Sequence, residues 1–172
     1  MAYTYSKIAT YTVGSGGVSS MAFLNIPQTY TDLLLKASTR DNRSASVDSE
    51  MYIRFNGSTA NSTSRYLYGS GASIASASSG GNIPLLVVSS SATANTFSNN
   101  EVYIPNYTSN NYKSLSIDSV SESNIASSVY IFSTAGLWSD TSPITSISIT
   151  PFGSNSFVQY SSFHLYGIKA EV

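Results

Sequence analysis

The sequence predicts an all-β protein, an antiparallel two-sheet sandwich of jelly-roll type with about ten short strands. Three observations predict it. Apolar and polar residues alternate with a period of two through much of the chain, and clusters of Gly, Asn and Ser separate the alternating segments. The only helix candidate is a short Ser-rich segment, 71–79. An immunoglobulin-type sandwich ranks second, because its usual pattern of Cys and Trp is missing.

The first half of the chain divides at turn-forming residues. Gly-Ser-Gly-Gly at 14–17 and the Asn56-Gly57 pair are sequences that reverse the chain. Met51, Ile53 and Phe55 alternate with polar residues, which predicts a strand with one buried face. In chain order we expect strands at 7–13, 19–26, 31–39, 50–56, 64–69 and 83–88.

The second half repeats this organisation. Leu115 and Ile117, and later Ile147 and Ile149, alternate with Ser, Thr and Asp. We expect strands at 100–105, 111–121, 127–134, 143–151 and 156–168, the last broken near Tyr160. Two stretches rich in Ser, Ala, Gly and Asn, 69–82 and 89–100, are expected to be long loops.

Composition limits the chemistry that the chain can perform. Its 172 residues include eight Lys and Arg, nine Asp and Glu, one His and no Cys. Acid–base catalysis and metal binding draw mainly on those residue types, so we expect no enzyme activity, no catalytic site, no cofactor and no metal. The net charge of −1 and the lack of a long apolar run favour neither nucleic acid nor a membrane as partner. The start of the chain has no apolar segment typical of a signal peptide.

The mass of 18.3 kDa fits one domain, so residues 1–172 are expected to form a single β-sandwich. Residues 1–13 are a candidate attachment strand or arm, since the segment alternates and carries little charge. His164 is interpreted as a surface or interface residue, and Trp138 as a core or rim residue.

The densest charged segment runs from Arg40-Asp41-Asn42-Arg43 to Asp48 and Glu50. One interpretation is a polar site for calcium or for sugar hydroxyls, because carboxylates and amides ligate both. The favoured interpretation is a solvated loop in front of the strand at 50–56. The segment therefore leaves a bound metal or glycan open.

Tyrosine is the more informative residue type, with 13 copies. Tyrosine offers a large contact area and a polar tip, which suits subunit interfaces and sugar stacking. The low charge also favours self-association, so we expect a homo-oligomer, with a trimer favoured. The candidate interface residues are Tyr3, Tyr5, Tyr11, Tyr103, Tyr107 and Tyr112.

Several segments, from about residue 24 onward, resemble small structural proteins of tailed bacteriophages. The matching stretches read YTDLLLKASTR at 30–40, IRFNG at 53–57, YLYG at 66–69, EVYIPNY at 101–107, ITSISI at 144–149 and SSFHLYGI at 161–168. In that group the last stretch often reads SSFSLYGI, so this chain differs at His164. The resemblance implies a jelly-roll-like module on the virion, as a capsid decoration, tail or fibre protein, and it carries over no catalytic residues.

These expectations combine into one leading hypothesis with two rivals. The first is a non-enzymatic virion structural protein, made in the bacterial cytoplasm, that binds the major capsid protein and its own copies. The alternative is a carbohydrate-binding or host-receptor-binding module of a tail or fibre, with a glycan as ligand; two or more exposed aromatic residues beside Asn or Asp would distinguish it. The least favoured is a polysaccharide-cleaving enzyme, which needs two carboxylates about 5–10 Å apart in a groove.

Overall fold

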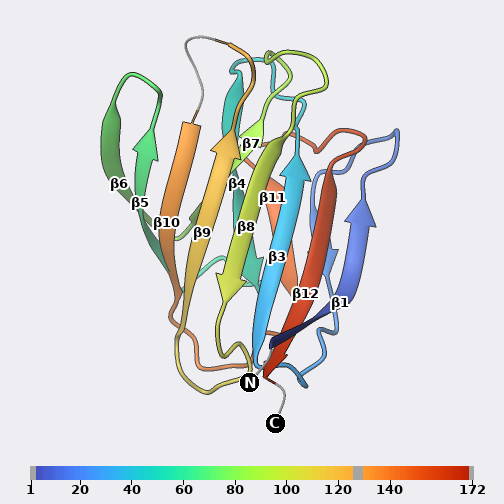
Figure 1. Cartoon of the computed structure of the whole chain (residues 1–172), viewed down its shortest axis with the longest axis vertical. Coiled ribbons are helices and arrows are strands. Elements are labelled where there is room, and N and C mark those ends of the chain that lie inside the picture. The colour runs from blue at the N-terminus through green and yellow to red at the C-terminus, as the bar shows by residue number, and fades with distance from the viewer. Residues whose placement is uncertain (1–2, 126–129, 171–172) are drawn as a thin grey trace.

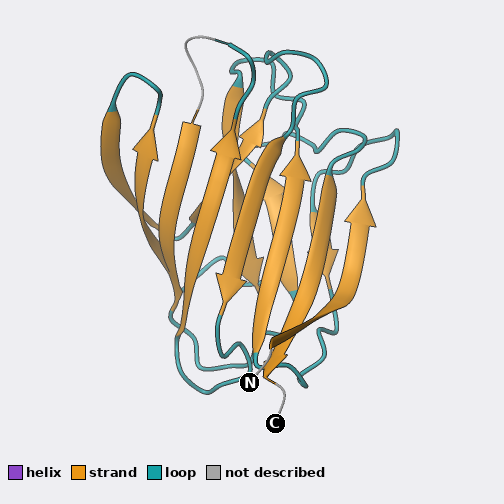
Figure 2. Cartoon of the chain, in the orientation of Figure 1, coloured by secondary structure: helices purple, strands orange, loops and turns teal. Residues whose placement is uncertain are grey.

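The computed structural model describes residues 3–125 and 130–170, and this part of the chain contains strands and no helix (Figure 2). Accordingly, no described helix is long and apolar enough to cross a membrane. The strands are β1 (Tyr3–Thr12), β2 (Met21–Phe23), β3 (Asp32–Thr39), β4 (Asp48–Phe55), β5 (Ser62–Gly69), β6 (Ile74–Gly80), β7 (Ile83–Val88), β8 (Ser98–Ile104), β9 (Lys113–Ser121), β10 (Tyr130–Trp138), β11 (Ile147–Pro151) and β12 (Ser162–Ala170).

Two antiparallel sheets pack face to face, which confirms the predicted sandwich, with twelve described strands in place of the expected ten or so (Figure 1). The eight-stranded sheet has the order β1-β12-β3-β8-β9-β10-β5-β6, and the four-stranded sheet has the order β2-β11-β4-β7. From β2 onward the chain passes repeatedly from one sheet to the other: β3, β5–β6, β8–β10 and β12 join the large sheet, and β4, β7 and β11 join the small one. This alternate winding is that of a jelly roll, with additional strands in the larger sheet.

The helix candidate at 71–79 does not form a helix, because residues 74–79 belong to β6. The expected loop 69–82 is therefore mostly strand, and the expected loop 89–100 ends in β8, which starts at Ser98. Of the predicted strand 127–134, residues 127–129 lie outside the described part of the chain, and β10 continues to Trp138. The predicted break near Tyr160 is present, since Tyr160 adopts a positive φ of 74° just before β12.

The hydrophobic core fills the space between the sheets because inward-facing residues recur at every second position of the strands. In β4, for example, Met51, Ile53 and Phe55 are buried while their neighbours are partly exposed. Trp138 belongs to this core, with its ring centroid 5.5 Å from that of Phe55. The alternating residues that the sequence singled out all belong to this core: Met51, Ile53, Phe55, Leu115, Ile117, Ile147 and Ile149.

Arg40 is a buried cation that fixes a long connection. Its guanidinium donates hydrogen bonds to backbone carbonyls between Ser90 and Thr96, at 2.8–3.2 Å. The neighbouring Asp41 is fully buried. The predicted solvated loop is therefore wrong at these two residues, because both are buried and the segment 89–97 supplies the polar partners of Arg40.

The two sheets differ in size, so part of the large sheet is not covered by the small one. In the small sheet, β7 packs against β8, β9, β10 and β5 of the large sheet. The large sheet continues beyond this contact to β6, and β5 and β6 flare away from the rest of the molecule (Figure 1). We call β10, β5 and β6 the flank. Its inner face extends past the cover that the small sheet provides.

Candidate functional site

Four aromatic side chains lie together on the inner face of the flank. Tyr66 and Tyr68 come from β5, and Tyr130 and Phe132 come from β10, where Phe132 pairs with Tyr68 across the strands. The Tyr66 and Phe132 rings stack at a centroid distance of 5.2 Å, and the Tyr68 ring lies 5.7 Å from Phe132. Since strand residues two apart share a face, the spacing of these residues places all four rings on one side of the sheet.

The polar face of β4 forms the opposite wall. Asp48, Glu50 and Tyr52 are partly exposed and alternate with the buried residues Ser49 and Met51. The Tyr52 hydroxyl donates a hydrogen bond to Glu50 Oε2 at 2.9 Å, which fixes one carboxylate oxygen. The two carboxylates therefore project side by side from one strand.

Arg43 and Phe152 form the rim. The Arg43 guanidinium lies 5.0 Å above the Phe152 ring centre and donates a hydrogen bond to Ser49 Oγ at 2.8 Å. The backbone N–H of Phe152 bonds the Glu50 carbonyl, and 44% of the residue stays exposed. The ring is thus anchored at its backbone while much of the residue remains accessible to solvent.

These elements enclose a single depression, which we call the aromatic cleft, with an open volume of about 440 Å³. It brings aromatic rings, hydrogen-bond acceptors and a guanidinium donor to one concave surface, as small-molecule sites typically do. Its defining residues are Arg43, Asp48, Glu50, Tyr66, Tyr68, Tyr130, Phe132 and Phe152.

Burial changes the acidity of groups in and beside this cleft. It raises the pKa of Asp48 to about 6, against the opposing effect of the Arg43 charge. Burial also raises the pKa of the Tyr52 phenol, and its bond to Glu50 acts in the same direction. Asp48 is therefore a carboxylate held in a poorly solvated place, where a ligand's hydroxyl or ammonium donor would replace missing water.

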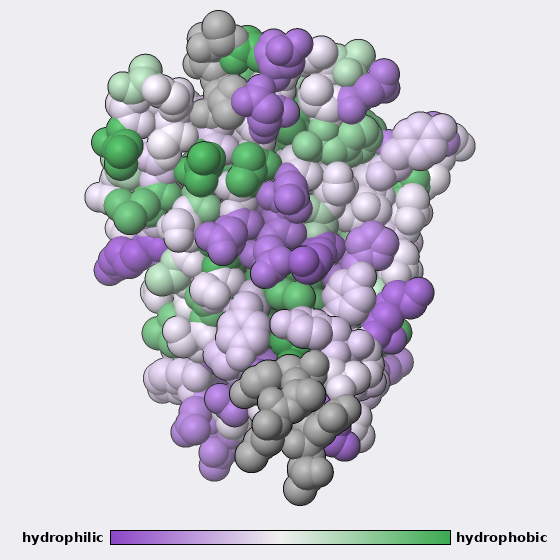
Figure 3. Space-filling view, in the orientation of Figure 1, coloured by the Kyte–Doolittle hydropathy of each residue, from purple (hydrophilic) through white to green (hydrophobic). Residues whose placement is uncertain are grey.

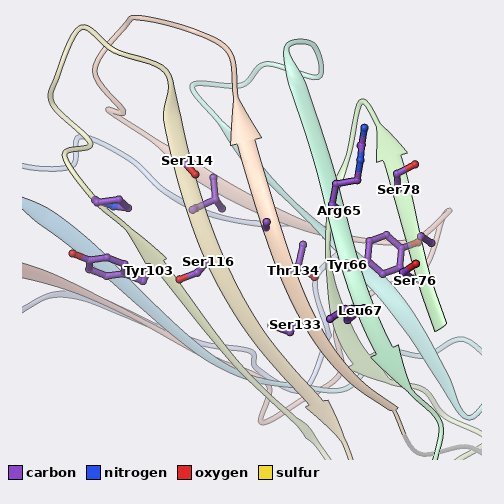
Figure 4. A pocket seen from close by; sticks show the side chains of 14 residues that line it. Arg65, Tyr66, Leu67, Ser76, Ser78, Tyr103, Ser114, Ser116, Ser133 and Thr134 are labelled. Carbon is purple, nitrogen blue, oxygen red and sulfur yellow. The ribbon is translucent and has the colours of Figure 1, made fainter. Parts of the chain in front are cut away.

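A second, larger depression of about 900 Å³ lies on the outer face of the large sheet (Figure 4). Cross-strand pairing aligns Tyr103, Ser116, Ala135, Arg65 and Ser78 in one row across five strands. The floor is built from small side chains, with Tyr103 on one side and Arg65 on the other. The Tyr103 hydroxyl donates to Asp32 Oδ2 at 2.8 Å, so this depression is an open trough with fewer free recognition groups than the aromatic cleft.

The outer face also carries a band of polar side chains (Figure 3). Lys36 and Glu101 form an exposed ion pair at 2.8 Å, and Asp118 stands opposite Glu101 in the next strand. His164 Nδ1 lies 3.1 Å from Thr10 Oγ1 in the same region. His164 is thus a partly exposed surface residue. No described group of three or more His, Asp or Glu side chains is placed to hold a metal ion.

The predicted interface tyrosines do not share one surface. Tyr5 and Tyr112 are each 60% exposed, and Tyr11 and Tyr103 are exposed to a lesser degree. Tyr5 pairs with the outward-facing Ile168 and Tyr11 with the inward-facing Phe163, because a bulge in β1 changes the face.

Tyr107 is not a surface residue: it is fully buried, and its hydroxyl donates to the Pro27 carbonyl, so it cannot contact another molecule in this fold. The side chain of Tyr3 lies outside the described residues, although its backbone starts β1. The candidate arm 1–13 is, over residues 3–12, an edge strand paired with β12.

Sequence reasoning found the charged wall of the aromatic cleft. It singled out the charged segment that contains Arg43, Asp48 and Glu50 and considered sugar hydroxyls as its ligand. It missed Tyr130, Phe132 and Phe152, which are far from this segment in the chain. The sequence did hold one clue to the aromatic wall: the spacing of Tyr66 and Tyr68 places their two rings on one face of a strand. It does not show that this face lies opposite β4.

In comparisons with known proteins, no family model, no curated protein and no solved structure matches this chain. Function is therefore inferred from the residues of the chain itself.

Proposed function

We propose that this protein is a non-enzymatic carbohydrate-binding module and that the aromatic cleft is its binding site. One observation carries the proposal: partly exposed aromatic rings, two carboxylates and a guanidinium converge in one open cleft. Aromatic rings stack on the apolar faces of sugar rings, while carboxylates and Arg bond the hydroxyl groups. The cleft thus places one exposed ring, Phe152, and three partly exposed tyrosines beside Asp48 and Glu50, which supports a carbohydrate-binding module.

The charges of the cleft select the class of sugar. Asp48 and Glu50 face a single cation, Arg43, so the cleft is negative once Asp48 is ionised above pH 6. Acidic sugars would be repelled there. Neutral oligosaccharides and amino sugars fit better, because their hydroxyl and ammonium groups donate to the carboxylates.

Binding fits this geometry better than hydrolysis does. Glycoside hydrolysis needs two carboxyl groups that flank the scissile bond. Asp48 and Glu50 are two positions apart on β4, so they project in parallel from the same wall. The opposite wall carries aromatic rings, which offer a stacking surface for the ligand.

A glycan array with neutral, amino and acidic oligosaccharides tests the proposal, followed by calorimetry on the best binder. We expect Phe152→Ala and Glu50→Gln to weaken that binder by tenfold or more. Tyr112→Ala is the matched control, because Tyr112 is 60% exposed but does not line the cleft. An array without binders, or equal losses in the control, would contradict the proposal.

A virion structural role is the second candidate function, and the exposed tyrosines favour it. Tyr5 and Tyr112 present large accessible rings on a chain with little charge, which suits contacts with other virion proteins. A capsid decoration protein that binds the major capsid protein, which the resemblance noted in the sequence implies, would use such contacts. A location in the virion and a homotrimer remain predictions.

Quantitative mass spectrometry of purified particles separates these roles. Hundreds of copies per particle would support capsid decoration, and a handful would support a receptor-binding part at a tail or vertex. Tyr112→Ala should lower incorporation if Tyr112 contacts the shell, whereas Phe152→Ala should leave it unchanged. Absence from particles would contradict a virion role without affecting the glycan test on the purified chain.

A further inference from the structure

Three of the four sheet ends in the described chain are protected against pairing with another strand. At one end of the large sheet, β1 has a register shift between Lys7 and Ala9, and Lys7 is exposed. In the small sheet, β2 has three residues, and β7 contains Pro84 and buried side chains. Bulges, short strands, lysine and proline are the devices by which sheet edges avoid unwanted partners.

The fourth end, β6, has none of these devices. Its seven residues, IASASSG, include no charge and no proline, and its pairing with β5 continues without a shift in register. Ile74 at its start is 85% exposed, more than any other large hydrophobic residue described. Figure 3 shows apolar surface on this flank, where Leu67 and Ile131 are also exposed. An open, uncharged edge of this kind is a template for another strand.

The direction of the free backbone groups follows from the hairpin between β5 and β6. The Ser70 N–H bonds the Ser73 carbonyl, and the Gly81 N–H bonds the Ser62 carbonyl. In an antiparallel ladder, hydrogen-bonded and non-hydrogen-bonded pairs alternate. The residues of β6 that direct their N–H and C=O groups away from β5 are therefore Ile74, Ser76, Ser78 and Gly80.

We propose that β6 is a dimerisation edge, on which a second copy of this chain pairs antiparallel through its own β6. In a register centred on Ala77, each residue of β6 that directs its backbone N–H and C=O groups away from β5 lies opposite another such residue of the second copy. Ser76 then faces Ser78 of the partner subunit, and Ile74 faces Gly80 of the partner subunit. Because the strand has no charge, self-pairing meets no like-charge repulsion, and facing serines form favourable cross-strand pairs. The exposed side chain of Ile74 then packs beside Gly80 of the partner subunit, which has no side chain of its own.

The pairing does not depend on the aromatic cleft, but it affects how the cleft would be used. A two-fold axis perpendicular to the sheet keeps the inner face of both copies on the same side. The two clefts would then open next to each other, and a repeating polysaccharide would meet two sites at once. This consequence rests on the proposed carbohydrate function, whereas the dimer itself does not.

Sedimentation velocity on the purified full-length chain across the micromolar range tests the proposal. We expect a reversible monomer–dimer equilibrium. Ser76→Lys combined with Ser78→Lys should raise the dissociation constant by tenfold or more, because the introduced lysines face one another. Ser76→Lys combined with Ser78→Glu should restore dimerisation, since each introduced lysine then faces an introduced glutamate. Ser133→Lys, on the same outer face but away from the edge, is the matched control.

Both serines are exposed, so the variants should fold, and circular dichroism with thermal unfolding checks this. A monomer at every concentration would overturn the proposal, and so would a trimer. A dimer that is unaffected by the double lysine variant would overturn it as well. If the chain dimerises as expected but binds no glycan, only the proposed carbohydrate function is contradicted.

Discussion

Asp48→Asn should make this protein more stable at neutral pH while weakening its binding site. The pKa of Asp48 is raised to about 6 in the folded chain, whereas an unfolded aspartate titrates near 4. Between these values the folded state binds more protons than the unfolded state. The contribution of Asp48 to the free energy of unfolding is therefore fully present below pH 4 and is lost as the pH rises through 6.

The magnitude follows from the size of the shift. A difference of about two pKa units corresponds to about 3 kcal/mol once the carboxylate is ionised. Because Asp48 is only partly buried, solvent screening reduces this, and we expect the free energy of unfolding to rise by about 1–2 kcal/mol at pH 7.5. For a chain of this length the melting temperature should rise by about 3–6 °C.

Urea unfolding of both proteins at pH 4 and pH 7.5 measures this effect. Asp41 also has a raised pKa because of burial, so the wild-type pH profile alone would mix two groups. The difference between wild type and Asp48→Asn isolates Asp48, since Asp41 is present in both. A difference that is the same at the two pH values would refute the reasoning about Asp48 burial.

Three further substitutions test individual contacts by urea unfolding. Arg40→Met leaves several loop carbonyls without their donor and should cost about 2–4 kcal/mol; no loss would contradict the role of this cation. Gly167→Ala places a methyl group against the partly buried ring of Tyr30 and should cost about 1–3 kcal/mol, whereas Gly14→Ala, in open space, is its neutral control. Lys36→Ala breaks an exposed ion pair with Glu101 and should change stability by less than about 0.5 kcal/mol; a larger loss would reveal coupling across the outer face.

The strands of the core were predictable because burial imposes a period of two on the sequence. Met51, Ile53 and Phe55 show it directly, and the same holds for the inward residues of β9 and β11. The strand β6 was not predictable, because neither of its faces is covered by the second sheet. Without a buried face there is no selection for alternating hydrophobicity, so its Ser and Ala residues look like a loop.

The aromatic cleft was only partly predictable for a different reason. Its polar wall is local in sequence, since Arg43, Asp48 and Glu50 lie within eight positions of one another. The opposite wall depends on which strands meet it, and that is decided by the sheet order rather than by any local pattern. Tyr130 pairs with the end of β9, and only the register of the sheet brings it to the cleft.

Because its side chains are small, β6 can line a depression on each face of the sheet and also leave its edge open for pairing. Its inward positions, Ala75 and Ala77, leave room for the aromatic cleft, which Ala77 lines, and its outward serines line the trough on the other side. Larger residues would fill both depressions, and charged ones would block the edge. The same composition that removes any hydrophobic pattern from β6 is therefore what keeps the cleft open and the strand able to pair.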